Sequence, residues 1–430
     1  MISKRECPLC GNKEVEKIFT INYSNNKEIN GLPNNHDIVF CDNCSLVYND
    51  FISNEEEFIK YYSLNSSYNE SYHIVHLKND SYNNEILNSL EKHINKNSYI
   101  LEEGCGSGDL LYNFYINGYS NLYGIDASNA FNAIKNISNI NFISGSIFNR
   151  IIEYKSKFDM IIISHVLEHL LDIDEIIKNI KYMLNDSGYL YISVPSLMEY
   201  SSNFKTPFFS FSLEHISHFC EQSINNLANK YSFEIVNISN SFNKAGIMEL
   251  RVLLKNTNLA NINFNTEDND TIKKYIKNYF NTAKTNMNSI INDIIHKNEK
   301  VIIWGIGATT LSLFSLGLEK LNIINIIDNS PKKQGKYING IKIISPQEIN
   351  DEEATILILP ELYYDSIYNQ IKEMGLKNKV KFLTDRQTDR QTDRQTDRQT
   401  DRQTCKEYIY LNNNILTNKL QAMRQYYNVA

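Results

Sequence analysis

The stretch LEEGCGSGDLLYNF, residues 101–114, decides the fold that we expect for this chain of 430 residues. Its three glycines, at positions 104, 106 and 108, follow the short apolar run SYILE (98–102) and precede a second apolar segment. Glycine lets a backbone turn sharply and approach a ligand closely, where a Cβ would collide. A helix that begins after such a turn presents unpaired N–H groups to the ligand. The stretch therefore predicts a strand, a turn and a helix that bind a nucleoside-bearing ligand.

Alternating strands and helices continue for about 150 residues, which predicts an α/β fold with a doubly wound, Rossmann-like parallel sheet. The expected strands are NLYGID (121–126), INFISG (140–145), FDMIIIS (158–164) and GYLYISVP (188–195). Asp126 ends the first of them, 22 residues after Gly104, where a carboxylate can accept both ribose hydroxyls. The complete expected ligand-binding set is Glu102, Gly104, Cys105, Gly106, Gly108, Asp126, Ser146, Ser164 and His165.

The segment FDMIIISHVLEHLLDIDEIIKNIKYMLNDSGYLYISVP (158–195) resembles the second half of class I methyltransferases, and the motif G-x-G-x-G differs from the dinucleotide pattern G-x-G-x-x-G. The resemblance implies S-adenosylmethionine as the cofactor; a nicotinamide enzyme and a domain that only binds are the alternatives. Two positions depart from the common pattern. Glu103 stands where an aliphatic residue is usual, and SGSIFN (144–149) lacks the usual acidic contact to adenine, for which Ser146 is the expected substitute.

Four cysteines near the start form two C-x2-C pairs, Cys7 with Cys10 and Cys41 with Cys44. Four thiolates can close a tetrahedral zinc site, and such a site is structural because no coordination position stays open for chemistry. A reducing compartment favours metal over disulfides for these cysteines. We therefore expect a zinc-binding domain at residues 1–54.

The segment PFFSFSLEHISHF (207–219) follows the last expected strand and places Glu214 beside His215 where methyl acceptors bind in this fold. Histidine is the natural base near neutral pH, and an adjacent carboxylate can orient it. A histidine that packs or caps a helix is the alternative. On the helix expected after residue 164, His165 is a candidate for the acceptor pocket, and His169 for a structural role.

A second α/β unit begins at KVIIWGIGATT (300–310), with further strands at INIIDN (324–329) and ATILILP (354–360). Its Gly305-x-Gly307 and Asp328 imitate a dinucleotide site, but we favour a degenerate domain that helps to hold a substrate and binds no NAD. Residues 384–404 are five copies of Thr-Asp-Arg-Gln plus a final Thr, which cannot bury a core. The repeat reads as translated copies of the tetranucleotide ACAG, typical of length-variable tracts in bacterial surface-glycan genes.

The whole layout resembles the three-domain sugar C-methyltransferases, over residues 1–383. YYSLNSSY (61–68) is similar to the substrate loop of that family. WGIGATTLSLF (304–314) and IIDNSPKKQGKYINGIKIISPQEI (326–349) are similar to its C-terminal domain. The resemblance implies domains at 1–54 (zinc), 55–255 (methyltransferase) and 256–383 (Rossmann-like), followed by the repeat at 384–404 and a tail at 405–430.

The resemblance also implies a reaction, C-methylation of a nucleotide-linked 4-keto deoxysugar. His215 would be the base, Glu214 would orient it, and Tyr62 or Tyr68 would steady the enolate oxygen. This chain has Ser212 and Leu213 where the family has tyrosine and histidine before the acidic residue, which leaves O-methylation of a sugar or glycan hydroxyl open.

Composition and charge limit the other possibilities. The net charge of −7 and the absence of a basic stripe argue against nucleic acid and against a methyltransferase acting on RNA; one acting on protein stays open as a further alternative. No run of 18 apolar residues and no signal peptide occur, so we expect a cytoplasmic protein without a membrane span. The oligomeric state is left open.

Overall fold

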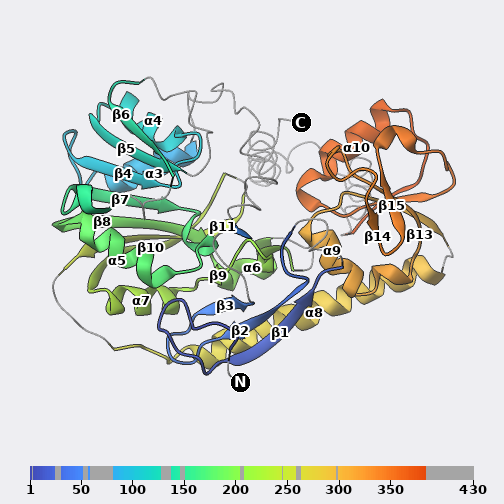
Figure 1. Cartoon of the computed structure of the whole chain (residues 1–430), viewed down its shortest axis with the longest axis horizontal. Helices are drawn as coiled ribbons and strands as arrows, with labels where there is room; N and C mark the ends of the chain where they lie inside the picture. The colour runs from blue at the N-terminus through green and yellow to red at the C-terminus, as the bar shows by residue number, and fades with distance from the viewer. Residues whose placement is uncertain are drawn as a thin grey trace, which may run out of the picture.

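The structure is a computed structural model. It describes residues 1, 3–24, 31–51, 57–58, 81–126, 137–145, 151–203, 208–244, 246–257, 263–296 and 299–383. Tyr62, Tyr68, Ser146, the repeat and the tail lie outside these ranges. The described chain contains three sheets, and the N-terminal one lies between the other two (Figure 1). Among the described residues, no helix has the length and apolarity needed to cross a membrane.

The sheet formed by strands within residues 99–256, called the central sheet because it lies in the middle of the sequence, has the strand order β10-β11-β8-β7-β4-β5-β6. Its strands are β4 (Tyr99–Glu103), β5 (Asn121–Asp126), β6 (Ile140–Ser144), β7 (Phe158–Ser164), β8 (Leu184–Pro195), β10 (Phe233–Phe242) and β11 (Met248–Asn256). β4 to β8 are parallel, and β11 is antiparallel to both of its neighbours. Its helices include α3 (Ser81–Leu90), α4 (Asp109–Ile116), α5 (Ile173–Met183) and α7 (Glu221–Lys230). The expected α/β Rossmann-like fold is confirmed.

The carboxyl ends of the parallel strands meet at one edge of this sheet, and the glycine turn follows β4 there. β5 and β7 have the predicted bounds, and β8 begins four residues before its predicted start. The helix expected to carry His165 and His169 was wrong. A short 3-10 turn, η5 (Leu167–His169), follows β7, and α5 begins only at Ile173. His165 itself has a φ of 54°, which is incompatible with a helix start.

The N-terminal sheet has the order β1-β2-β3-β9 and is antiparallel. Its strands are β1 (Glu16–Asn22), β2 (Asn35–Phe40), β3 (Val47–Asp50) and β9 (Ser217–His218). β9 comes from the segment directly after the Glu214–His215 pair, so two parts of the chain more than 160 residues apart complete one sheet.

The C-terminal sheet has the order β14-β15-β13-β12-β16-β17, and only β14 is antiparallel to its neighbour. Its elements are β12 (Lys300–Trp304), α9 (Ala308–Ser315), β13 (Asn322–Ile327), β14 (Tyr337–Ile338), β15 (Ile341–Ile344), β16 (Thr355–Ile358), α10 (Tyr364–Glu373) and β17 (Val380–Phe382).

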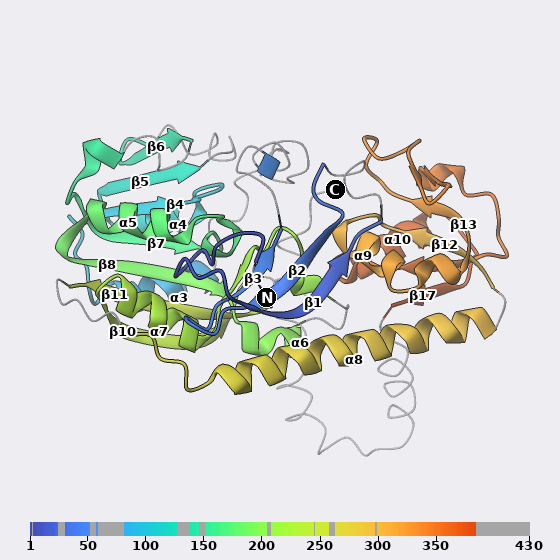
Figure 2. The same cartoon turned by 60° about the horizontal axis from the view of Figure 1, so that its bottom comes forward.

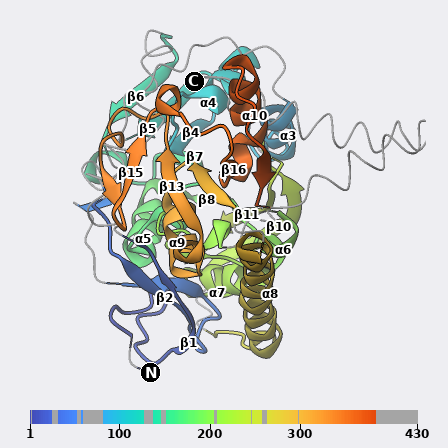
Figure 3. The same cartoon turned by 90° about the vertical axis from the view of Figure 1, so that its right-hand side faces the viewer.

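A long helix, α8 (Asn269–His296), runs beneath the N-terminal sheet toward the C-terminal sheet (Figure 2). Phe280 of this helix stacks on Phe19 of β1 with 4.4 Å between the ring centroids. The same apolar cluster includes residues of β2, α8 and β12, so the N-terminal and C-terminal sheets share a core. Figure 3 shows β1 and β2 beside α8 when the molecule is viewed along this helix.

Candidate active site

The glycine turn connects β4 to α4 at the carboxyl edge of the central sheet. The N–H groups of Gly104 and Cys105 both donate to the carbonyl of Ile125, which ties the turn to β5. Gly104 has a φ of 68°, and a Cβ there would lie 2.3 Å from Cγ2 of Val166. Only glycine fits this position, because the turn after β4 packs directly against the segment after β7.

Acidic residues surround the turn. Asp126 Oδ2 accepts a 2.7 Å hydrogen bond from the N–H of Gly106, so the predicted ribose-binding carboxylate is fixed against the turn. Glu102 is buried, and this burial, followed by the charge of Asp109, raises its pKa to about 8. A ligand that brings positive charge to this edge would favour the ionised form of Glu102.

Glu103, the departure noted in the sequence, is also buried at 8% exposure. In the ladders it pairs with Ile125 of β5 on one side and Ile163 of β7 on the other. A carboxylate between two central apolar strands is expensive unless it has polar contacts, and Glu103 has such contacts. Its position places this carboxylate at the same edge as Glu102.

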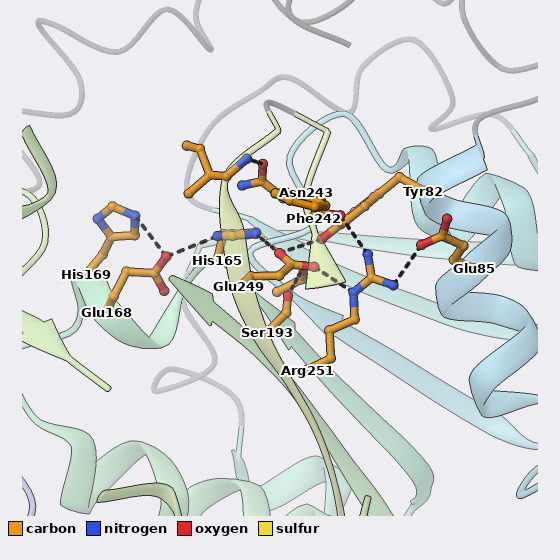
Figure 4. Close-up of polar contacts among 12 residues, drawn as sticks. Tyr82, Glu85, His165, Glu168, His169, Ser193, Phe242, Asn243, Glu249 and Arg251 are labelled. Atoms are coloured by element: carbon orange, nitrogen blue, oxygen red, sulfur yellow. Dashed lines mark hydrogen bonds and ion pairs between the residues drawn. The ribbon is translucent and has the colours of Figure 1, made fainter. Parts of the chain in front are cut away.

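His165 follows β7 and lies between two carboxylates (Figure 4). Its Nε2 is 2.5 Å from Oε2 of Glu249, and its Nδ1 is 3.3 Å from Oε1 of Glu168. Burial alone would lower the pKa of His165, but Glu249 and then Glu168 outweigh burial and raise it to about 10. His165 is therefore an imidazolium at neutral pH.

Glu249 continues this network along β11. Its Oε1 accepts from Nε of Arg251 at 2.7 Å, and its Oε2 accepts from the hydroxyl of Tyr82 at 3.2 Å. Arg251 also contacts Glu85 of α3 at 3.1 Å. The buried carboxylates of Glu168 and Glu249 are balanced by the cations of His165 and Arg251, which offsets the cost of burying each charge. The network connects α3 to β11 and to the residue that follows β7.

The histidine–carboxylate cluster consists of Glu168, His169 and His215, and its ligand-type atoms all lie within 4.8 Å of one another. The rings of His169 and His215 meet edge to face with 5.0 Å between centroids. Burial favours protonation of Glu168, but contact with His165 and the charges of the other histidines hold its pKa at about 2. Burial, reinforced by the charge of His169, lowers the pKa of His215 to about 4, so the ring is neutral at pH 7.

The carboxylate in this cluster is that of Glu168 and not that of Glu214, the residue predicted to orient His215. The backbone carbonyl of Glu214 instead lies 2.8 Å from Nδ1 of His169. Its side-chain charge acts on Tyr23, whose pKa is raised by burial and, after it, by Glu214. The structure thus brings His215 together with a carboxylate from another segment of the chain.

Asn49 of β3 holds the loop that carries His215. Its Nδ2 donates to the carbonyls of Ser212 and His215 at 2.9 and 2.8 Å, and its Oδ1 lies 3.2 Å from Nε2 of His218. Asn49 is fully buried. The N-terminal sheet therefore fixes the backbone of the predicted catalytic segment.

The four cysteines of the two C-x2-C pairs come together as expected. Their sulfur atoms lie within 4.8 Å of one another, with 3.5 Å between Cys7 and Cys44 and between Cys10 and Cys41. A tetrahedral site with zinc–sulfur bonds of about 2.3 Å needs sulfurs about 3.8 Å apart. The donor set and spacing therefore fit a four-coordinate metal ion.

Of the predicted residues, the structure gathers Glu102, the glycine turn, Asp126, Ser164 and His165 at one edge. The hydroxyl of Ser164 lies 2.7 Å from that of Ser193 on β8. The sequence reading gave no role to Glu168 or the network residues Glu249, Arg251, Tyr82 and Glu85. A signal for two of them was present, because Glu249 and Arg251 interrupt the otherwise apolar strand MELRVLLKN (248–256) at alternate positions.

In the C-terminal unit, the residues that resemble a dinucleotide site have contacts within the chain. Asp328 Oδ2 accepts from the N–H of Ile306 at 2.9 Å and pairs with Lys333 at 3.4 Å. A Cβ at Gly305 would meet Pro360 at 2.6 Å, so packing by itself accounts for this glycine. Asp328 thus bonds the turn after β12 as Asp126 bonds the turn after β4, and the degenerate-domain interpretation stays a prediction.

Residues 76–238 match a family model described as a methyltransferase domain. Residues 297–381 match a second model, described as C2185-like, N-terminal. No curated protein matches the sequence. The match over residues 76–238 supports the expected enzyme class, an S-adenosylmethionine-dependent methyltransferase.

Three solved structures that resemble the chain each cover half of it or less. A 1,6-didemethyltoxoflavin-N1-methyltransferase from Burkholderia thailandensis, with bound S-adenosylhomocysteine, is 16% identical, with a TM-score of 0.38, over 50% of this chain and 95% of that one. A putative S-adenosylmethionine-dependent methyltransferase from Listeria monocytogenes is 17% identical, with a TM-score of 0.33, over 40% and 97%. Magnesium protoporphyrin IX methyltransferase from Synechocystis PCC 6803 is 15% identical, with a TM-score of 0.32, over 48% and 90%.

Proposed function

With residues 76–238 matched to a methyltransferase domain as the premise, we propose that this chain methylates a carbon atom of a nucleotide-linked 4-keto deoxysugar for surface-glycan biosynthesis. The observation that carries the proposal is the position of the histidine–carboxylate cluster. Val166, between His165 and the cluster, packs directly over Gly104 of the glycine turn. Cofactor and acceptor therefore share one edge of the central sheet.

The cofactor in this proposal is S-adenosylmethionine, held by the glycine turn and by Asp126. Gly108 provides no side-chain cap at the N-terminus of α4, and the backbone of Leu111 hydrogen-bonds with Glu102. The first N–H groups of α4 are proposed to face a ligand carboxylate or hydroxyl. Glu102 and Asp126 supply negative charge near the sulfonium and the ribose, and Ser164 and His165 close the acceptor side. Ser146 keeps its proposed role at the adenine.

The acceptor chemistry needs a base and a stabilised oxyanion. The base takes a proton from the carbon next to the ketone, and the resulting enolate forms a C–C bond with the methyl group. The C–S bond breaks as this bond forms, and S-adenosylhomocysteine leaves. The proposed proton acceptor is the cluster around His215, with Glu168 as the carboxylate beside it and with Glu214 holding His169 through its carbonyl. Tyr62 or Tyr68 remains the proposed donor to the enolate oxygen.

The four thiols are proposed to bind zinc as a structural ion. All four coordination positions would be filled by protein, so this zinc would take no part in methyl transfer. It would stabilise the sheet from which Asn49 reaches the His215 loop.

The proposed substrate class rests on the resemblance of the three-part layout to that of the sugar C-methyltransferases. O-methylation of a sugar hydroxyl is the second candidate, because the same cluster could activate a hydroxyl. The acidic net charge of −7 disfavours an RNA substrate.

The test incubates the full chain with methyl-labelled S-adenosylmethionine in heavy water, using a panel of nucleotide-linked 4-keto sugars and their reduced counterparts. Label on carbon, with deuterium entering the α-position, is expected. Label on oxygen alone replaces the first candidate by the second, and no label on any sugar rejects both.

A further inference from the structure

The histidine–carboxylate cluster has the donor atoms of a metal site. A carboxylate oxygen of Glu168 and ring nitrogens of His169 and His215 converge within 4.8 Å, from two segments of the chain. Two imidazoles and one carboxylate suit divalent ions such as zinc, iron, cobalt and manganese. This group is separate from the four thiols, which come from the N-terminal segment.

Hydrogen bonds orient both rings toward Glu168. Nδ1 of His169 lies 2.8 Å from the carbonyl of Glu214, so this nitrogen carries the proton and donates it. The other nitrogen, Nε2, faces Glu168 at 3.9 Å. A metal-ligating histidine almost always donates its second N–H to a carbonyl or carboxylate in this way, which fixes the tautomer that can bind an ion.

His215 brings a ring nitrogen within 4.8 Å of the donor atoms of Glu168 and His169. Its Nδ1 has no hydrogen-bond partner among the described residues, while the ring forms a backbone hydrogen bond with Ser210. A buried acceptor nitrogen without a partner is costly, and an ion at this point removes that cost.

Glu168 is the third donor and is 2% exposed. It forms an ion pair with His165, but neither of its oxygens has a hydrogen bond of acceptable geometry among the described residues. A carboxylate that buried normally takes several hydrogen bonds. His165 and His169 both face Oε1, at 3.3 and 3.9 Å, so Oε2 is the oxygen available to a further cation.

We infer that Glu168, His169 and His215 bind a divalent transition-metal ion, and that this ion holds the oxygen atom of the methyl acceptor. Bonds of about 2.0–2.2 Å would draw the three donors closer than they lie here, which side-chain rotation can supply. Three protein ligands leave positions open for water or for a keto or hydroxyl oxygen. The role of the ion rests on the proposed function, because it assumes that the acceptor binds at this edge.

A bound ion changes the part that His215 plays. With a ring nitrogen coordinated, His215 would hold the ion, and the base of the proposed function would be water beside the ion, which would lower the pKa of the ligated acceptor. The acceptor proton then passes to water in the open site, and the methyl group moves from sulfur to the acceptor as before.

The test measures metal binding by the full chain with its thiol site loaded with zinc. After a weak chelator has emptied exchangeable sites, Co²⁺ is titrated by calorimetry and by visible absorption, and zinc and cobalt are counted by mass spectrometry. One zinc and one cobalt per chain are expected, and the cobalt bands should lack thiolate charge transfer.

The variants Glu168→Gln and His215→Gln should each weaken Co²⁺ binding by at least the 10–100-fold typical of losing a supporting partner. His93→Gln, a histidine outside the cluster, should bind Co²⁺ like the wild type. Binding of S-adenosylmethionine by each variant serves as the check on folding.

Absence of a second equivalent in the wild type overturns the inference, and so does binding that persists unchanged in Glu168→Gln and His215→Gln. A methylation rate on keto sugars that is the same with and without Co²⁺ overturns the assigned role and leaves the proposed function standing. Cobalt binding at the cluster without methylation of any sugar leaves the site standing and rejects the proposed function.

Discussion

Gly104 occupies a position that a residue with a side chain does not fit. We predict that Gly104→Ala lowers the affinity for S-adenosylmethionine at least tenfold in calorimetry. The new methyl group would lie 2.3 Å from Val166, and overpacking of this kind costs about 1–3 kcal/mol in addition to the strain of a positive φ.

Gly118→Ala is the matched control for that substitution. Gly118 also has a positive φ, of 88°, but nothing lies within 4 Å of the Cβ that it would gain. Gly118→Ala should therefore be destabilised only by backbone strain, and it should bind S-adenosylmethionine as tightly as the wild type. Equal losses in the two variants would show that packing against Val166 does not matter.

Glu102 predicts a pH dependence of cofactor binding. Its pKa is raised from 4.5 to about 8 by burial and then by Asp109, so at pH 6.5 it is protonated in the free protein. The protonated carboxyl therefore contributes stability that is present below pH 4.5 and is lost as the pH rises through about 8. A cationic ligand reverses this preference, so binding of S-adenosylmethionine should release a proton at pH 6.5.

Calorimetry in two buffers of different ionisation enthalpy measures that proton. Glu102→Gln should bind without releasing it, and S-adenosylhomocysteine, which lacks the sulfonium charge, should release less. The same proton count for wild type and Glu102→Gln would remove Glu102 from the cofactor site.

At the scale of elements, β3 controls the segment that carries His215. Asn49→Ala would leave two buried carbonyls and the His218 ring without their partner, at a cost of about 1–3 kcal/mol for each group left unpaired. We expect a lower melting temperature and a large fall in methyl transfer, with cofactor affinity within twofold of wild type.

Asn117→Ala is a suitable comparison, because Asn117 is exposed and its side chain bonds only within the turn of α4. It should change neither the melting temperature nor the activity noticeably. Loss of cofactor binding in Asn49→Ala would contradict the separation between the β4 edge and the His215 loop.

The elements that the sequence predicted well are the ones whose pattern is local. β5 and β7 are central parallel strands, buried on both faces, and appear as continuous apolar runs. β10 was not anticipated because it is an edge strand whose residues are mostly exposed and polar, as in NISNSF (237–242). The helix expected at HVLEHL was wrong because a φ of 54° at His165 and burial of Leu167 and Glu168 impose a tight turn.

The candidate site likewise contains residues that spacing along the sequence predicted and contacts that it did not. The glycine turn, Asp126 and the thiol pairs follow from spacing along the chain, so the sequence was sufficient to find them. The partnership of His215 with Glu168 joins residues 47 positions apart, and that of His165 with Glu249 joins residues 84 apart. Contacts of this kind depend on how the strands are ordered in the sheet, which a single sequence does not specify.

At the scale of the whole molecule, the N-terminal sheet connects the thiol site to the loop that carries His215. We predict that stripping metal from the four cysteines, or Cys10→Ser, increases hydrogen exchange in β2, β3, β9 and the loop at 208–218, while β4, β5 and β7 keep their protection. The reason is that β9 pairs, among the described strands, only with β3, whereas β4, β5 and β7 each have parallel hydrogen-bonded neighbours on both sides. These strands share an apolar cluster with the cysteines, so their protection rests on the sheet hydrogen bonds. The turnover rate should fall as well, because the loop at 208–218 carries His215.

Hydrogen exchange followed by mass spectrometry measures this, with cofactor binding as the parallel readout. Zinc restored to the stripped wild type should recover both protection and turnover. Exchange that rises evenly over all three sheets, or that stays unchanged, would show that the thiol site does not support the loop.

The pairing of β3 with β9 also limits how such a gene can be rearranged. Ser217 and His218 complete the sheet of residues 16–50. One edge strand of this sheet is therefore encoded far downstream of the other strands. Recombination between these two segments of the gene would combine the sheet and thiol site of one parent protein with β9 and the His215 loop of another. Natural hybrids and laboratory chimeras of this architecture should therefore retain both segments from the same parent, even though the family match that defines the methyltransferase domain begins only at residue 76.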